Sequence, residues 1–298
     1  MVRSLPSVST PPYLDLPSGA RHVTLRTSGG GLAGLRIDAY GAAAGTAVLV
    51  PGWTGSKEDF IAVLEPLSRR GWDVVAYDQR GQYESIGPDD ESAYSLGALA
   101  HDLLEVLGQV GPAHVVGHSF GGLVAREAAL TSGGQGFASL TLLCSGPTSL
   151  PTSHHDGLGA LHAALPHVPL ETIWTVKDAA DREGGWRPPS DEVAAFMHHR
   201  FVANNPYALR AKTATLLDTP DRTDELAALA DGGFPVGVVY GPDDDAWPTA
   251  WQDRVAAAVG TEARVVDGAG HSPAAEQPER TADVLDALWR GFGPGEQG

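Results

Sequence analysis

The chain alternates between short apolar runs and longer segments whose leucines recur at helical spacing. The apolar runs have the length of buried strands, and they occupy residues 47–50, 73–77, 113–116, 140–143, 234–240 and 263–266. The clearest helical segment is 96–107, where Leu96, Leu99, Leu103 and Leu107 fall on one face. This alternation predicts a protein of the α/β class with a doubly wound, mostly parallel sheet.

The beginning of the chain departs from this alternation. Residues 23–27 and 35–39 predict edge strands that are joined by a glycine-rich turn. Residues 1–20 show no apolar periodicity and predict a loose N-terminal arm. The first 17 residues carry prolines and serines where a signal peptide has an apolar core, so we do not expect secretion by that route.

The alternation also stops between about residues 148 and 229, where no strand-like run occurs. Segments 190–202, 206–217 and 220–229 show helical patterns, and prolines separate them. We therefore expect an all-helical insertion at 148–229. The core would then consist of residues 1–147 and 230–298.

Charge and cysteine content narrow the range of partners. The formal net charge is −17, and no basic block is longer than Arg69-Arg70, which argues against nucleic acid and anionic membranes as partners. No apolar stretch approaches the ~20 residues of a membrane helix. The single cysteine, Cys144, rules out an intrachain disulfide, which is typical of a reducing compartment, so we expect a cytoplasmic protein. The pattern does not indicate an oligomeric state.

Five residues in the middle of the chain, Gly117-His118-Ser119-Phe120-Gly121, lie between a predicted strand and a predicted helix. This context favours a sharp turn that presents Ser119 above the sheet, with glycines where a Cβ would collide with the backbone. Ser119 is therefore the candidate nucleophile, and we expect His118 to point away beneath the turn. The alternative is a chance match in a chain with 37 glycines.

A serine hydroxyl needs a histidine base and an orienting carboxylate to react near neutral pH. The run 234–240 is followed by Asp243, Asp244 and Asp245, and the run 263–266 is followed by His271. An open parallel sheet places catalytic groups in such loops after its strands. The histidines between residues 150 and 200 lack the spacing of a zinc site, so no metal is expected.

These motifs, in this order, resemble those of the α/β-hydrolase family from about residue 21 to residue 289. The resemblance implies an eight-stranded sheet with the helical segment 148–229 as a cap inserted after the sixth strand. In that family the catalytic acid stands three residues after the glycine closing the seventh strand, with a proline four residues further on. This frame selects Asp244, whereas Asp243 and Asp245 remain alternatives as turn carboxylates. His271 matches the Gly-His-x-Pro ending of the family.

The resemblance also implies an oxyanion hole in the loop that follows residues 47–50. The family usually begins this loop with His-Gly, whereas this chain has Pro51-Gly52. The donors would be the backbone amides of Trp53 and Phe120, so the histidine is dispensable. The other interpretation is an ordinary turn before a helix capped by Ser56 and Asp59, and the two can hold together.

The pattern as a whole predicts a serine hydrolase that cleaves a small to medium neutral carboxylic ester or lactone through an acyl-enzyme on Ser119, without a cofactor. Aromatic residues that could contact the substrate are Trp53, Trp174, Trp186, Phe196 and Trp247, although packing of cap against core explains the cap residues as well. Hydrolysis of a carbon–carbon bond, thioester or amide would need the same residues. A ligand-binding receptor on this fold is the alternative from another class.

Overall fold

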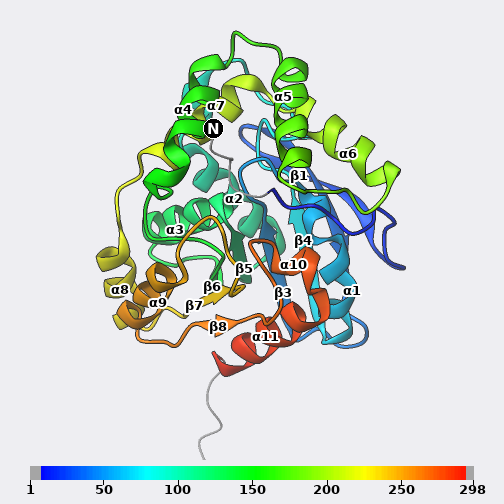
Figure 1. Cartoon of the computed structure of the whole chain (residues 1–298). Coiled ribbons are helices and arrows are strands. Elements are labelled where there is room, and N and C mark those ends of the chain that lie inside the picture. Colours follow the sequence, from blue (N-terminus) through cyan, green and yellow to red (C-terminus); the bar gives the residue numbers. More distant parts are fainter. Residues whose placement is uncertain (1–7, 293–298) are drawn as a thin grey trace, which may run out of the picture.

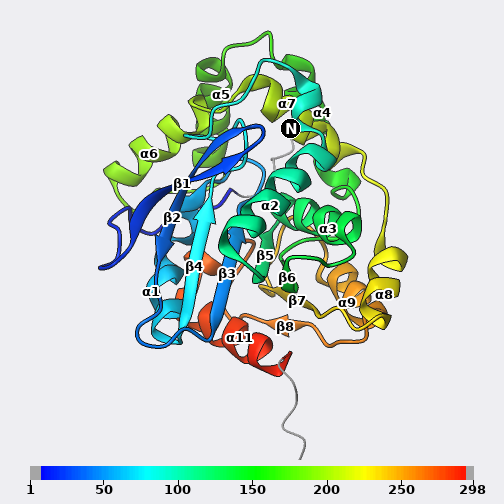
Figure 2. The same ribbon diagram turned by 180° about the vertical axis from the view of Figure 1, so that it is seen from behind.

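The computed structural model describes residues 8–292, and its centre is an eight-stranded sheet (Figures 1 and 2). The strands are β1 (Arg21–Thr27), β2 (Gly30–Ile37), β3 (Gly45–Val50), β4 (Trp72–Tyr77), β5 (Ala113–His118), β6 (Phe137–Leu143), β7 (Val236–Tyr240) and β8 (Arg264–Val265). Their order in the sheet is β1-β2-β4-β3-β5-β6-β7-β8. β2 is antiparallel to β1 and β4, and all other neighbouring strands are parallel. The predicted α/β class and mostly parallel sheet are confirmed.

Helices cover both faces of the sheet. They are α1 (Ile61–Arg69), α2 (Leu96–Val110), α3 (Phe120–Ser132), α4 (His155–Ala164), α5 (Leu170–Glu183), α6 (Asp191–Val202), α7 (Pro206–Leu217), α8 (Thr223–Asp231), α9 (Thr249–Ala258), α10 (Pro273–Glu276) and α11 (Pro278–Gly291). Short 3-10 helices lie at Lys57–Phe60, Glu91–Tyr94 and Thr152–His154. α2 and α3 lie on one face, and α1 and α11 on the other (Figures 1 and 2).

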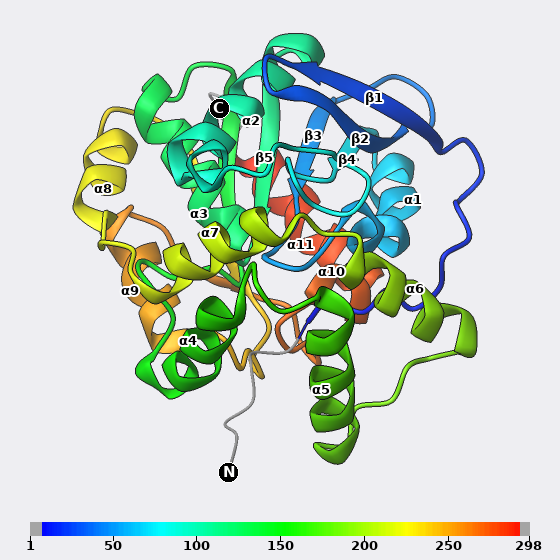
Figure 3. The same cartoon turned by 90° about the horizontal axis from the view of Figure 1, so that it is seen from above.

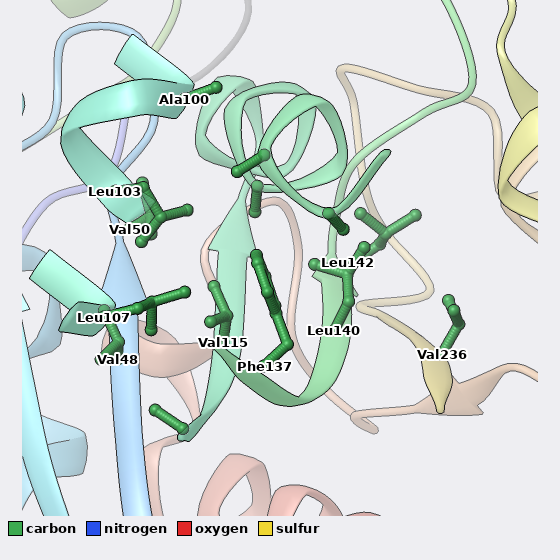
Figure 4. Close-up of a cluster of buried hydrophobic side chains, with 14 of the residues drawn as sticks. Val48, Val50, Ala100, Leu103, Leu107, Val115, Phe137, Leu140, Leu142 and Val236 are labelled. Carbon is green, nitrogen blue, oxygen red and sulfur yellow. The ribbon is translucent and has the colours of Figure 1, made fainter. Parts of the chain in front are cut away.

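The sheet has two hydrophobic layers because successive strand residues point to opposite faces. In β3, Val48 and Val50 belong to the layer under α2 and α3, whereas Ala47 and Leu49 belong to the layer under α1 and α11. Figure 4 shows the first layer, in which Leu103 and Leu107 of α2 point toward β3. Leu103 is fully buried, so truncating it to alanine would cost about 2–5 kcal/mol of stability.

The segment between β6 and β7 is helical throughout, and all of its residues are described. α4, α5, α6 and α7 lie over the carboxyl ends of the strands, as Figures 1 and 3 show. α8 lies lower, beside α9, and its Leu226 packs into the layer under α2 and α3. The sequence pattern missed α4 and α5. The domain boundaries at 147/148 and 229/230 stay predictions.

The N-terminal arm differs from the expectation. Residues 1–7 lie outside the described part, but several of residues 8–20 pack against the core. Ser9 is only 6% exposed, and Leu16 and Ala20 pack against the layer under α1 and α11. The sequence missed this because the contacts of the arm are made by single residues without periodicity. Among the described residues, no helix is long and apolar enough to span a membrane.

Candidate active site

The turn between β5 and α3 presents Ser119 in a strained backbone conformation. Its φ of 55° is positive, which costs a residue with a side chain roughly 1–3 kcal/mol. The neighbouring glycines make the turn possible, because a Cβ on Gly117 would lie 2.5 Å from Gly122 Cα and one on Gly121 would lie 2.3 Å from the carbonyl oxygen of Val50. The amide of Ser119 donates to Leu143 in β6, which fixes the turn to the sheet.

The structure brings Ser119, His271 and Asp244 together in one chain of hydrogen bonds. Nε2 of His271 lies 3.0 Å from Oγ of Ser119, and Nδ1 lies 2.7 Å from Oδ1 of Asp244. Because an ionised carboxylate only accepts hydrogen bonds, Nδ1 carries the proton and Nε2 is free to accept from the serine hydroxyl. The three side chains come from loops after β5, β7 and β8, at the carboxyl edge of the sheet.

Further hydrogen bonds hold the carboxylate of Asp244. Oδ1 also accepts from the amide of Ala246 at 2.9 Å, and Oδ2 accepts from Nε2 of Gln252 at 2.8 Å. The side chain is fully buried. Neither Asp243 nor Asp245 shows a hydrogen bond to His271 in the described part of the chain. Gln252, in α9, was not singled out by the sequence because a glutamine on a helix carries no signal of its own.

Burial and hydrogen bonding act in opposite directions on these two side chains. Burial alone lowers the pKa of His271, but the hydrogen bond and negative charge of Asp244 outweigh it, so the pKa is raised above its usual 6.5. Burial alone raises the pKa of Asp244, but the hydrogen bond and charge of His271, together with the hydrogen bonds from Ala246 and Gln252, outweigh it and the pKa is lowered. The pair is therefore poised with Asp244 ionised and His271 more basic than a free histidine.

His118 lies closer to the site than the sequence indicated. Its Nε2–H donates to the carbonyl oxygen of His271 at 2.7 Å, and its ring lines the cavity beside Ser119. Burial lowers the pKa of His118 to about 3, so the ring stays neutral near neutral pH. His118 therefore supports the backbone of the histidine loop instead of pointing away beneath the turn.

The predicted oxyanion loop, which follows β3, is held by hydrogen bonds from the turn after β4. Nε2 of Gln79 donates to the carbonyl oxygen of Pro51 at 2.8 Å, and Nε2 of Gln82 donates to that of Gly52 at 2.7 Å. These contacts hold the carbonyl groups of Pro51 and Gly52 in place. Within residues 8–292 neither the amide of Trp53 nor that of Phe120 donates to a protein acceptor, and of these two residues Trp53 lines the cavity. The oxyanion role of the two amides stays a prediction.

The same loop is also held by a contact with helix α7 and by a contact at its own end. The indole Nε1 of Trp53 donates to Oγ1 of Thr213 in α7 at 3.1 Å. At the end of the loop, the carboxylate of Asp59 accepts from the amide of Ser56 at 3.2 Å. The capping interpretation of this segment therefore holds, and it is compatible with the oxyanion role.

A cavity opens beside Ser119, and its lining differs from the predicted set of aromatic residues. It is lined from the core by Trp53, His118, Ser119 and His271, from the helical segment by Leu150 and Leu216, and from the N-terminal arm by Val8 and Ser9. Of the five aromatic residues singled out in the sequence, only Trp53 lines this cavity.

The other four aromatic side chains pack elsewhere. Trp247 is 1% exposed, lies 6.3 Å from the His271 ring and donates to the carbonyl oxygen of Thr148. Trp174 packs on Phe201 at a ring distance of 5.5 Å. The remaining two, Phe196 and Trp186, lie against Tyr83 and Arg182 respectively. These four side chains therefore take part in packing and do not line the cavity.

One group of side chains in the described residues has the composition of a metal site, and it overlaps this arrangement. Potential ligand atoms of Cys144, Asp244 and His271 lie within 4.8 Å of one another. Burial raises the pKa of the Cys144 thiol well above its usual value, and Nδ1 of His271 is already hydrogen-bonded to Asp244. Because the thiol stays protonated and Nδ1 of His271 is occupied, these three residues do not fit a divalent cation.

Comparisons with known proteins agree with the architecture. The model of the alpha/beta hydrolase family matches residues 47–284. The putative carbamate hydrolase RutD of Variovorax paradoxus is 30% identical over 234 residues, which cover 74% of this chain and 83% of that protein.

Two solved structures are similar in fold. A thermophilic esterase from Thermogutta terrifontis is 21% identical with a TM-score of 0.71, covering 92% of this chain and 100% of the esterase. The N-acyl homoserine lactonase AidH, complexed with N-butanoyl homoserine, is 21% identical with a TM-score of 0.71, covering 93% of this chain and 99% of the lactonase.

Proposed function

The chain belongs to the alpha/beta hydrolase family, and from this premise we propose that it is a serine hydrolase that cleaves small to medium neutral esters or lactones through an acyl-enzyme on Ser119. The observation that carries the proposal is the continuous hydrogen-bond chain from Ser119 through His271 to Asp244. The substrate is a small molecule, and residues 148–229 act as the cap that limits its access to Ser119.

In the proposed reaction, Oγ of Ser119 attacks the carbonyl carbon while Nε2 of His271 takes the hydroxyl proton. Asp244 keeps the proton of the imidazole on Nδ1 and stabilises the imidazolium that forms. The amides of Trp53 and Phe120 donate to the oxyanion, and each such donor is worth roughly 10²- to 10³-fold in rate. His271 then protonates the leaving group, and a water molecule, deprotonated by the same ring, hydrolyses the acyl-enzyme.

A carbamate is a second candidate substrate, because the relative from Variovorax paradoxus bears the name of a putative carbamate hydrolase. A carbamate offers the same electrophilic carbonyl carbon to Ser119, so the same steps apply. Thioesters, amides and carbon–carbon bonds next to a carbonyl group would also pass through an oxyanion at this position. The arrangement of Ser119, His271 and Asp244 therefore supports a class of reaction more strongly than a single substrate.

The test combines covalent labelling with a substrate panel. A fluorophosphonate should label the purified protein, and the label should be absent from Ser119→Ala. The panel should contain p-nitrophenyl acetate and butyrate, a γ-lactone, a simple carbamate, a thioester and an anilide. Absence of both labelling and turnover in the folded protein would contradict the proposal and favour a ligand-binding receptor.

A further inference from the structure

The N-terminal arm contributes a wall of the candidate active site. Val8 and Ser9 line the same cavity as Ser119 and His271. Figure 3 shows the segment that precedes β1 passing beneath α6, between the helical segment and the core. We call residues 8–10 the strap. It is close to Ser119 in space although more than a hundred residues separate the two in the sequence.

Hydrogen bonds hold the strap on two opposite sides. On one side, Oγ of Ser9 lies 2.7 Å from Oγ of Ser272, the residue that follows His271. On the other side, Nη2 of Arg200 in α6 donates to the carbonyl oxygen of Ser9 at 2.7 Å. Within the strap, the hydroxyl of Thr10 donates to the carbonyl oxygen of Val8 at 3.3 Å. The strap thus joins the histidine loop to the helical segment.

The anchor on the helical side is itself fixed. Nη1 of Arg200 pairs with the carboxylate of Asp59, a residue that also lines the cavity. The side chains of Arg200 and Asp59 are 1% and 2% exposed. A buried pair of this kind is strongly held, because separating the partners leaves an uncompensated charge away from water. The strap is therefore attached to a rigid part of the molecule and keeps a defined position.

The size of the cavity shows what the strap does there. The volume open to the centre of a water molecule is about 30 Å³, and roughly 10–15 Å³ of such space is needed for one water molecule. A space of this size holds a few water molecules, or a group no longer than a short acyl chain. Val8 and Ser9 line this space, so their side chains limit its size on the side of the strap.

We propose that the strap is a specificity-determining wall, in which Val8 and Ser9 exclude substrates with long acyl chains from Ser119. The inference rests on the proposed function, because it concerns which substrates reach the nucleophile. It predicts that the preferred substrates are short-chain esters, small lactones or small carbamates. It also predicts that the wall can be removed without touching the residues that perform the chemistry.

The experiment compares chain-length profiles of kcat/KM for p-nitrophenyl esters from acetate to decanoate. The variants are Val8→Gly with Ser9→Gly, and a chain that lacks residues 1–10. Each further methylene that the opened pocket accommodates should raise kcat/KM about fourfold. We expect the ratio of kcat/KM for octanoate to kcat/KM for acetate to rise at least ~10-fold in these variants. Val8→Trp should act in the opposite direction and lower butyrate hydrolysis.

A matched control in the same arm is Tyr13→Ala, because Tyr13 is 47% exposed and does not line the cavity. An unchanged chain-length profile in the folded double variant, or an equal shift in Tyr13→Ala, would overturn the inference. Should the shortened chain fail to fold, the double variant and Val8→Trp decide the matter. Fluorophosphonate labelling of Ser119 distinguishes failure of the proposed function from failure of the inference about the strap. If neither the parent protein nor any variant is labelled, the proposed function is wrong. If all are labelled equally and the chain-length profile is unchanged, only the role of the strap is wrong.

Discussion

The two sides of the cavity are built by different kinds of interaction. On the core side, Ser119 sits in a strained turn, and His271 and Asp244 are held by directional hydrogen bonds. On the opposite side, Leu150 and Leu216 of the helical segment contribute apolar side chains from a large packed cluster. Hydrogen bonds and turns tolerate few substitutions, whereas packing tolerates many. We therefore expect substitutions on the core side to change the rate of the chemical step, and substitutions on the opposite side to change which substrates are accepted.

Removing the base is the most severe way to test this contrast. His271→Ala should reduce ester turnover on the order of 10⁶-fold. Ser119, His271 and Asp244 act as one catalytic unit, so losing the base costs about as much as losing all three. His167→Ala is the matched control in the helical segment, since His167 is exposed there, and it should retain full activity. The measurement is kcat/KM on one ester, with circular dichroism to verify folding. Substantial turnover in folded His271→Ala would remove this histidine from the mechanism.

Exchanging each of the adjacent carboxylates in turn should have the next largest effect. Asp244→Asn keeps the shape of the side chain but presents an amide where Nδ1–H of His271 needs an acceptor. We expect a loss of about 10⁴-fold in kcat, by analogy with serine proteases. Asp243→Asn and Asp245→Asn should cost far less, because the carboxylate that accepts from Nδ1 of His271 is that of Asp244. If the large loss of kcat occurred in Asp243→Asn or Asp245→Asn instead, the assignment of Asp244 as the catalytic acid would be wrong.

The contrast between the two sides also explains how far sequence reasoning could go. The turn at Ser119 was predictable because steric limits on Gly117 and Gly121 leave a visible pattern. The position after β7 left three adjacent aspartates open, and the spacing of the resembled family selected Asp244. Its hydrogen bond to His271 in the structure matches that choice. Helix α2 was predictable because its leucines recur at helical spacing: Leu103 and Leu107 pack into the layer over the sheet, and Leu99 packs into the cluster under the helical segment.

The cavity wall could not be predicted in the same way. Which aromatic residue faces a cavity depends on how helices cross, and single-sequence periodicity carries no information about crossing angles. Trp174 of α5 and Phe201 of α6 pack against each other within the helical segment, whereas their positions in the sequence would also have allowed either of them to face the substrate. The position of Ser9 was invisible for another reason, since its partners Arg200 and Ser272 are about 190 and 260 residues away in the chain and no local pattern marks such contacts.

The pH dependence of turnover tests the electrostatics of the core side with a smaller effect. His271 accepts a proton from Ser119 only when its ring is neutral, so kcat/KM should rise with pH through one ionisation above 6.5, because the pKa is raised. One pH unit below that pKa, activity should be about tenfold lower. In Asp244→Asn the raising contact is lost while burial remains, so the rise should move to lower pH. His118 should not contribute, because its pKa is lowered to about 3.

The smallest effects should come from the aromatic residues of the helical segment that do not line the cavity. Trp186 lies under the guanidinium of Arg182 at 5.8 Å, and Phe196 lies edge-on against Tyr83 at 5.6 Å. Because neither side chain lines the cavity, Trp186→Ala and Phe196→Ala should change kcat/KM for a short ester by less than about threefold. This corresponds to less than ~0.7 kcal/mol in the activation free energy.

Trp174→Ala sharpens the same point, because Trp174 packs on Phe201 in the cluster between helical segment and core. Its removal should lower the free energy of unfolding by about 2–4 kcal/mol, since Trp174 is only partly buried and truncating a fully buried tryptophan costs about 3–5. Its kcat/KM should nevertheless stay close to that of the parent protein. The measurements are thermal unfolding and the ester chain-length profile on the same samples. A changed profile in a stable Trp174→Ala protein would place this side chain against the substrate and make the helical segment, together with the strap, a determinant of specificity.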